Sequence, residues 1–206
     1  SIGSTAPFIG LFGTGKIATH MMPMLARNFS IREMRVNSRR PESTAAFVAH
    51  HAPNVPFAMR AEADGRKVAE GADVVLTITE ANAPLVNPGV MKPGSVVMSM
   101  GGKHEVHYGV LAESQRLVVD DVDFASEVGD GGAWISQGHF TPQSFAARVD
   151  ALACEAFAGT KPVRLKADDR VVAIVQGMAV GDVAFASYAY QEAERRGIGT
   201  VVELPE

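Results

Sequence analysis

The residues best suited to chemistry lie near the start of the chain, in a turn rich in glycine, Gly10-Leu11-Phe12-Gly13-Thr14-Gly15-Lys16-Ile17-Ala18. Gly13 allows a tight turn, Gly15 lets the backbone approach a pyrophosphate, and Ala18 permits close packing of a helix on a strand. Free N–H groups at the start of the following helix would bind the phosphates. The turn predicts a dinucleotide site, with a ligand-free glycine turn as the alternative. The expected contacts are Gly13, Thr14, Gly15, Lys16 and Ile17.

A second polar segment follows the next expected strand, where the adenosine ribose of a bound dinucleotide would lie. An acid at this place suits the free 2′-hydroxyl of NAD, whereas hydroxyl and guanidinium groups suit a 2′-phosphate. The chain has no acid there; its residues are Asn37, Ser38, Arg39 and Arg40. The segment favours NADP(H), with NAD(H) as the alternative. One of the two arginines, such as Arg40, could instead be a solvated residue before a helix.

Two later strands end in polar residues and glycines, at the sheet edge where ligands bind in open α/β folds. The first end is Thr77-Ile78-Thr79-Glu80, and the second is Ser99-Met100-Gly101-Gly102-Lys103-His104-Glu105. The hydroxyls would contact the nicotinamide ribose, and the two glycines would let the ring lie against the backbone. The expected cofactor contacts here are Thr77, Ile78, Thr79, Ser99, Met100 and Gly101.

Titratable side chains beside that edge are the catalytic candidates. Lys103, His104 and Glu105 lie near the expected reaction zone, although each could be an ordinary surface residue, and Lys103 and His104 are the preferred candidates. His104 and His107 have the spacing of one helix face, but no third ligand accompanies them. The sequence therefore predicts no metal site.

The elements that must position these residues alternate between strand and helix. Buried apolar strands separated by helices indicate an α/β fold of the Rossmann type, doubly wound, with a mainly parallel sheet and helices on both faces. Helices are expected at 15–28, 41–51, 61–71, 104–114, 142–158 and 178–196. Strands are expected at 7–12, 34–36, 55–59, 72–79, 95–100, 116–120 and 171–175, with a strand-like end at 200–204.

The stretch from Gly129 to Gly138 breaks this alternation because it holds four glycines within ten residues. It predicts a mobile loop that carries Trp134, the single tryptophan. Trp134 and His139 could form a lid, with a plain exposed loop as the stronger alternative. The single cysteine, Cys154, is expected to be a small buried residue on a helix.

Length and composition set the broad class. The chain has 206 residues, 47% of them hydrophobic, and a formal net charge of −4. This content is sufficient for one large domain, and there is no basic stripe of the kind that binds nucleic acid. No apolar run approaches the roughly 20 residues of a membrane span. The first seven residues lack the character of a signal peptide, so a cytoplasmic protein is expected.

Motifs along nearly the whole chain resemble the ornithine cyclodeaminase/mu-crystallin family. They occur in the family's order and at similar distances, which is more specific than the glycine turn alone. The matching stretches are 9–15, 36–42, 71–75, 76–79, 91–94, 118–121, 177–184 and 196–200.

The resemblance implies several properties. Family members bind NAD(P)(H) in a Rossmann domain, which here would be 1–206, and the motif at 177–184 adds Gly177 to the expected cofactor contacts. They are typically homodimers joined through a separate domain, built mainly from residues that precede these motifs. That domain supplies the arginine and lysine side chains that hold the substrate carboxylate, so no substrate clamp is named here. The segment from about 168 to 206 is expected to return toward that domain.

One departure from the family bears on the reaction. Cyclodeaminases carry an aspartate general base after the Gly-Gly pair, whereas this chain has Lys103, a poor base at an ordinary pKa near ~10.4. Glu105 or Asp121 could substitute for it. The expected function is an NAD(P)(H)-dependent oxidoreductase that transfers hydride to or from an amino acid or its imine, cyclic imines included. The alternatives are an ornithine-type cyclodeaminase and a non-catalytic NADPH-binding protein.

Overall fold

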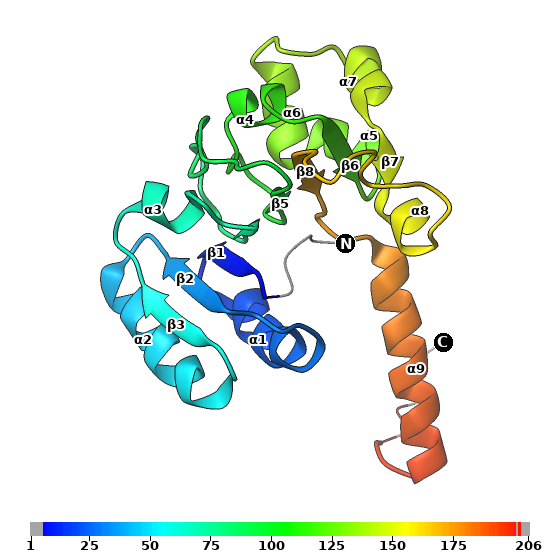
Figure 1. The fold of residues 1–206 in the computed structure, drawn as a ribbon. Helices are drawn as coiled ribbons and strands as arrows, with labels where there is room; N and C mark the ends of the chain where they lie inside the picture. Colours follow the sequence, from blue (N-terminus) through cyan, green and yellow to red (C-terminus); the bar gives the residue numbers. More distant parts are fainter. Residues whose placement is uncertain (1–5, 201, 203–206) are drawn as a thin grey trace. The chain divides into compact units, whose positions relative to one another are not determined.

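A sheet of parallel strands carries the candidate site (Figure 1). The computed structural model describes residues 6–200 and 202, and over these residues the strand order is β3-β2-β1-β4-β5-β8-β6-β7, with every pairing parallel. This confirms the doubly wound, mainly parallel fold. The strands are β1 (Phe8–Phe12), β2 (Glu33–Asn37), β3 (Ala58–Ala61), β4 (Val74–Thr77), β5 (Val96–Ser99), β6 (Arg116–Val119), β7 (Ala151–Leu152) and β8 (Val171–Ile174).

The chain forms two compact units, 1–176 and 177–206, and the first contains the whole sheet. Its helical segments are α1 (Lys16–Asn28), α2 (Pro41–His51), η1 (Ala52–Asn54), α3 (Gly65–Ala69), α4 (Tyr108–Ala112), α5 (Val122–Glu127), α6 (Gly129–Ser136), α7 (Pro142–Arg148) and α8 (Ala153–Phe157). The expectation of a single domain stays a prediction.

Alternate residues of each strand point to opposite faces of the sheet, and both faces are covered. On β1, Phe8 and Phe12 join a core cluster with α3, α4, α6 and α7, whereas Ile9 and Leu11 join a second cluster with α1 and α2. Gly10 lies between the two phenylalanines, where a Cβ would overlap the Val68 carbonyl of α3. Burial on both faces explains why these strands are apolar throughout.

The glycine-rich stretch 129–138 is not a loop, and the sequence prediction was wrong there. Residues 129–136 form α6, and a Cβ on Gly131 or Gly132 would overlap backbone oxygens of α5. These glycines therefore let α5 and α6 pack closely. Trp134 is fully buried, and its Nε1 donates to the Val106 carbonyl at 3.0 Å, so it is a core residue and not part of a lid. His139 is exposed and stacks on Tyr108.

The helix expected over 142–158 is interrupted by β7, which pairs with β6. Asp150, just before β7, accepts hydrogen bonds from Arg116, Arg148 and the backbone N–H of Leu117. These long-range partners hold the chain extended where its local pattern predicts a helix. Cys154 lies on α8 as expected, but it is exposed and not buried.

Other expected elements exist with different bounds. The helices predicted at 61–71 and 104–114 shorten to α3 and α4, and the third strand begins at Ala58. Val106, inside the second of those segments, forms a parallel bridge with Val86. The other predicted strands and helices of the first unit lie within a few residues of their predicted places, whereas α5 and η1 were not predicted.

The second unit contains α9 (Ala179–Arg196), which confirms the long helix expected at 178–196. It ends at Gly197, whose φ of 64° is in the left-handed region. The strand-like end expected at 200–204 lies mostly outside the described residues. Within the described residues, none of the helices is both long and apolar enough to cross a bilayer.

Candidate functional site

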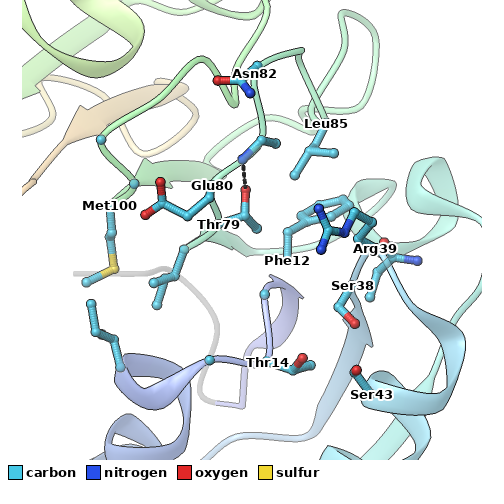
Figure 2. Close-up of a pocket in the computed structure, with 18 of the residues that line it drawn as sticks. Phe12, Thr14, Ser38, Arg39, Ser43, Thr79, Glu80, Asn82, Leu85 and Met100 are labelled. Carbon is cyan, nitrogen blue, oxygen red and sulfur yellow. Dashed lines mark hydrogen bonds between the residues drawn. The ribbon is translucent and has the colours of Figure 1, made fainter.

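A cleft of about 900 Å³ lies at the carboxyl ends of β1, β2, β4 and β5. Figure 2 shows side chains from these four strand ends around it. The structure brings most of the predicted cofactor contacts together here, although they come from segments far apart in the sequence. Those that line the cleft are Gly13, Thr14, Gly15, Lys16, Ile17, Asn37, Ser38, Arg39, Arg40, Ile78, Thr79, Met100 and Gly101.

The two glycines of the opening turn differ in what requires them. Gly13 has a φ of 111°, and a Cβ there would overlap the Ile78 carbonyl, so the fold itself demands glycine. Gly15 has an ordinary φ of −83° and nothing within 4 Å of where its Cβ would stand. The space beside Gly15 belongs to the cleft.

The first turn of α1 offers backbone N–H groups to this space. Gly15 is the N-cap of the helix and no side chain caps it. Uncapped N–H groups, together with the positive end of the helix dipole, bind anions well. Ala18 is fully buried, as its expected role in close packing requires.

Of the four polar residues at the end of β2, three have side chains that already make hydrogen bonds within the protein, and one does not. The Asn37 amide donates to the carbonyls of Glu62 and Ala63, at 2.7 and 3.3 Å. Ser38 Oγ contacts Thr44 Oγ1 at 2.8 Å, and Arg40 Nε donates to Ser43 Oγ at 3.2 Å. Arg39 is exposed, lines the cleft and makes no hydrogen bond or ion pair with any described residue. In Figure 2 it lies beside Phe12 and Ser38.

On the other side of the cleft, the predicted contacts lie at two depths. Thr79, Met100 and Gly101 line the cleft, as does the neighbouring Glu80. Thr77 and Ser99 are fully buried and do not line it. Each is the last residue of its strand, and its side chain faces the interior. The structure therefore does not bring these two hydroxyls to the cleft.

Beneath the lining residues lies a buried carboxylate, Glu105, which sequence reasoning considered as a titratable group near the reaction zone and as a substitute base. Glu105 is 0% exposed and accepts hydrogen bonds from four donors. Thr79 N and Thr79 Oγ1 donate to Oε1, at 2.6 and 2.5 Å, and Thr77 Oγ1 and Gly101 N donate to Oε2, at 2.9 and 3.0 Å. With both oxygens occupied and no access to solvent, Glu105 is not placed to act as a base.

A second buried carboxyl, Asp130, lies behind the first. Its Oδ1 accepts the backbone N–H groups of Glu105 and Val106, at 2.7 and 2.8 Å. Burial raises the pKa of Asp130 to about 7, against the lowering effects of the Ser99 hydroxyl and the two N–H groups, and the Glu105 charge adds to the rise. Sequence reasoning missed Asp130 because it lies in the stretch interpreted as a loop.

The catalytic candidates from sequence do not line the cleft. Lys103 is exposed. His104 is partly buried, and this burial, with the nearby charge of His107, lowers its pKa. His104 and His107 both precede α4, so they do not share a helix face as their spacing suggested. Asp121 caps α5 by accepting the N–H of Phe124 at 2.8 Å, which gives it a structural role.

Gly177 begins the second unit, where its φ of 93° explains the glycine. Gly177 is not among the residues that line the cleft of the first unit. Among the described residues, no group of three or more His, Cys, Asp or Glu side chains is arranged to hold a metal ion.

Comparison with known proteins gives consistent matches over the chain. The model of the ornithine cyclodeaminase/mu-crystallin family matches residues 3–197. An uncharacterized cyclodeaminase of Sinorhizobium fredii is 27% identical over 94% of this chain, and the alanine dehydrogenase of Archaeoglobus fulgidus is 25% identical over 95%. A Thermococcus litoralis Δ1-pyrroline-2-carboxylate reductase, solved with NADH and L-proline, has a TM-score of 0.86 at 22% identity over 96% of this chain. The chain spans 58%, 59% and 61% of their respective lengths.

Proposed function

The chain belongs to the ornithine cyclodeaminase/mu-crystallin family, and we propose that its cleft binds NAD(P)(H) for hydride transfer to or from an amino acid or its imine. The observation that carries the proposal is Gly15. Neither its backbone conformation nor any neighbour requires a glycine there, so the small residue serves what enters the cleft. A pyrophosphate at the uncapped start of α1 fits that requirement.

The two halves of the cleft suit the two halves of a dinucleotide. The adenosine half would lie over β2, beside Ser38 and Arg39, and the nicotinamide half over the ends of β4 and β5, beside Thr79 and Gly101. The phosphates between them would bind at Gly15. When bound, the nicotinamide supplies the hydride chemistry, while the chain binds the cofactor, orients it and shields one side of its ring.

The free guanidinium of Arg39 supports NADP(H) as the preferred cofactor. Arg40 is the weaker candidate for binding a 2′-phosphate, because its Nε already donates to Ser43 Oγ and lies 4.0 Å from Glu42 Oε1. No acid among the cleft-lining residues after β2 is placed to bind a free 2′-hydroxyl. NAD(H) stays the alternative, since the related reductase is described with NADH.

The names of the relatives support an amino acid or imine as the substrate class. The reductase is described with L-proline, and another relative is an alanine dehydrogenase. The proton donor for an imine is not assigned, because Lys103 and His104 do not line the cleft. The homodimer and the cytoplasmic location stay predictions.

The direct test has two stages. First, the chain is titrated with NADPH and with NADH, and the fluorescence of the nicotinamide is followed; saturable binding is expected, tighter for NADPH. Second, the full natural protein is assayed with NADPH and a panel of cyclic and linear imines, and the loss of nicotinamide absorbance is followed.

The outcomes separate the candidate functions. Turnover of an imine supports the oxidoreductase. Ammonia release from ornithine without net change of the cofactor would instead establish a cyclodeaminase, and tight NADPH binding without turnover of any substrate would leave a binding protein. Absence of saturable binding would overturn the proposal.

A further inference from the structure

We propose that Glu105 is a positioning residue, which fixes Thr79 and Gly101 as the floor for the nicotinamide half of the cofactor; this rests on the proposed function. A buried carboxylate is costly unless it is fully hydrogen-bonded. Glu105 meets that condition with four donors, all from the ends of β4 and β5.

The position of Glu105, at the ends of β4 and β5, explains its role. The last ladder bond between β4 and β5 runs from Met100 N to the Thr77 carbonyl, at 2.9 Å. Beyond it, Thr79 and Gly101 line the cleft. Glu105 accepts the N–H groups of both Thr79 and Gly101, which lie just past the ends of β4 and β5. It thus continues the cross-link between the strands by one more step.

The glycine at 101 is matched to this carboxylate. A Cβ on Gly101 would overlap the Glu105 carboxylate and the Thr79 carbonyl, so the three groups are in close contact. The carbonyl of Gly101 accepts Gln176 Nε2 at 3.2 Å, and Gln176 N donates to Asp120 Oδ2 at 2.7 Å. Both polar groups of Gly101 are therefore fixed from below the cleft.

Glu105 is itself held in place from α6. Asp130 accepts the backbone N–H groups of Glu105 and Val106, and Trp134 donates to the Val106 carbonyl. The path runs from the buried helix through Glu105 to two residues that line the cleft. A change at Glu105 should therefore act at the nicotinamide end, and leave the adenosine end over β2 unchanged.

The test compares two ligands on the same chain: NADPH, and 2′-phospho-ADP-ribose, which lacks the nicotinamide. The variant Glu105→Gln keeps the shape but leaves one accepting oxygen, and its amide would face an N–H donor. We expect NADPH affinity to fall roughly ten-fold, because a donor left unsatisfied no longer fixes the floor for the nicotinamide half. The affinity for 2′-phospho-ADP-ribose should change less than about two-fold. The emission of bound NADPH should also shift toward that of free NADPH.

A matched control is Asp73→Asn, at the opposite edge of the sheet. Asp73 accepts Phe8 N at 2.8 Å and pairs with Lys92 at 2.7 Å, so it also joins two segments through a carboxylate. Its loss should lower stability without changing the ratio of the two affinities. If Glu105→Gln does not fold, Thr77→Val removes one donor to Glu105 from a fully buried position outside the cleft. It should shift the ratio in the same direction by a smaller factor.

The results that would overturn the inference differ from those that would overturn the proposed function. Equal losses for both ligands in Glu105→Gln or Thr77→Val, or no loss in either variant, would make Glu105 a purely structural residue. A wild-type chain that binds both ligands equally would show that the floor contributes nothing to the nicotinamide, although dinucleotide binding would stand. A wild-type chain that binds neither ligand would overturn the proposed function, and this inference with it.

Discussion

Asp130 accepts the backbone N–H of Glu105 at 2.7 Å, so two buried carboxyl groups lie one behind the other beneath the cleft. Their environments differ. Glu105 receives four hydrogen bonds on its two oxygens, whereas both bonds to Asp130 reach Oδ1, and Oδ2 is buried without a regular hydrogen bond. Asp130 therefore has an oxygen, Oδ2, that is available to take up a proton.

Asp130 should make the stability of the fold depend on pH. Its pKa is about 7 in the folded state against 3.8 in the unfolded chain, so folding favours the protonated form. The contribution of Asp130 to the free energy of unfolding is fully present below pH 3.8. It is lost as the pH rises to about 7, by at most about 1.4 kcal/mol per pH unit. In Asp130→Asn, the amide replaces the protonated acid and this loss should vanish.

Chemical denaturation of wild type and Asp130→Asn at several pH values checks this. The two should be equally stable near pH 4, and the variant should be the more stable above pH 7. The difference in stability between wild type and variant cancels the contributions of other titrating groups, such as Asp73. Burial raises the pKa of Asp73, but the bonds from Lys92 and Phe8 outweigh burial and lower it, so its effect on stability has the opposite sign. A difference that does not change with pH would contradict the assignment.

The two glycines of the turn should separate folding from binding. Gly15→Val has room and an ordinary φ, so stability should change by no more than about 1 kcal/mol while NADPH binding is abolished. Gly13→Ala instead requires a strained φ and displaces the Ile78 carbonyl, at a cost of roughly 1–3 kcal/mol. Thermal unfolding and NADPH titration of both variants give the comparison. Unchanged NADPH affinity in Gly15→Val would mean that the phosphates bind elsewhere.

Arg39 should determine the choice between the two cofactors. A guanidinium on a 2′-phosphate contributes about 1.5–3 kcal/mol, so Arg39→Ala should weaken NADPH binding by at least ten-fold and leave NADH binding nearly unchanged. Arg40→Ala is the matched control, because Arg40 is already paired with Ser43, and its effect should be smaller. Fluorescence titration of both variants with both cofactors measures this. An equal loss of NADH binding in Arg39→Ala would remove the case for NADP(H).

The effects of substituting Trp134 and His139 on stability should follow from how deeply each side chain is buried. Trp134→Ala leaves a cavity in the core and an unpaired Val106 carbonyl, which should lower the free energy of unfolding by about 3–5 kcal/mol. His139→Ala should change stability by no more than about 1.5 kcal/mol, because the exposed ring loses only its stacking on Tyr108. Neither change should act as the loss of a lid would, by speeding cofactor release in a folded protein. Stopped-flow measurement of NADPH release from His139→Ala tests that point.

Local features of the sequence were sufficient for the fold class and for one side of the cleft. The opening turn, the apolar strands and the absence of an acid after β2 are all contained in short stretches, and parallel strands bring their carboxyl ends to one edge. For the same reason, most of the expected cofactor contacts line one cleft. Periodicity also located α1, α2 and α9, whose local patterns agree with their surroundings.

Only the tertiary structure decided the roles of Glu105 and Asp130. Glu105 bonds Thr77 across 28 positions, and Asp130 bonds Glu105 across 25, so no local pattern indicates that either carboxyl is buried. Along the sequence, the glycines beside Asp130 predict a loop. In the folded chain they are part of a helix, because their lack of side chains lets that helix pack closely against α5. The sequence alone thus predicted many of the residues that line the cleft, whereas the buried groups that hold them depend on contacts that only the folded chain makes.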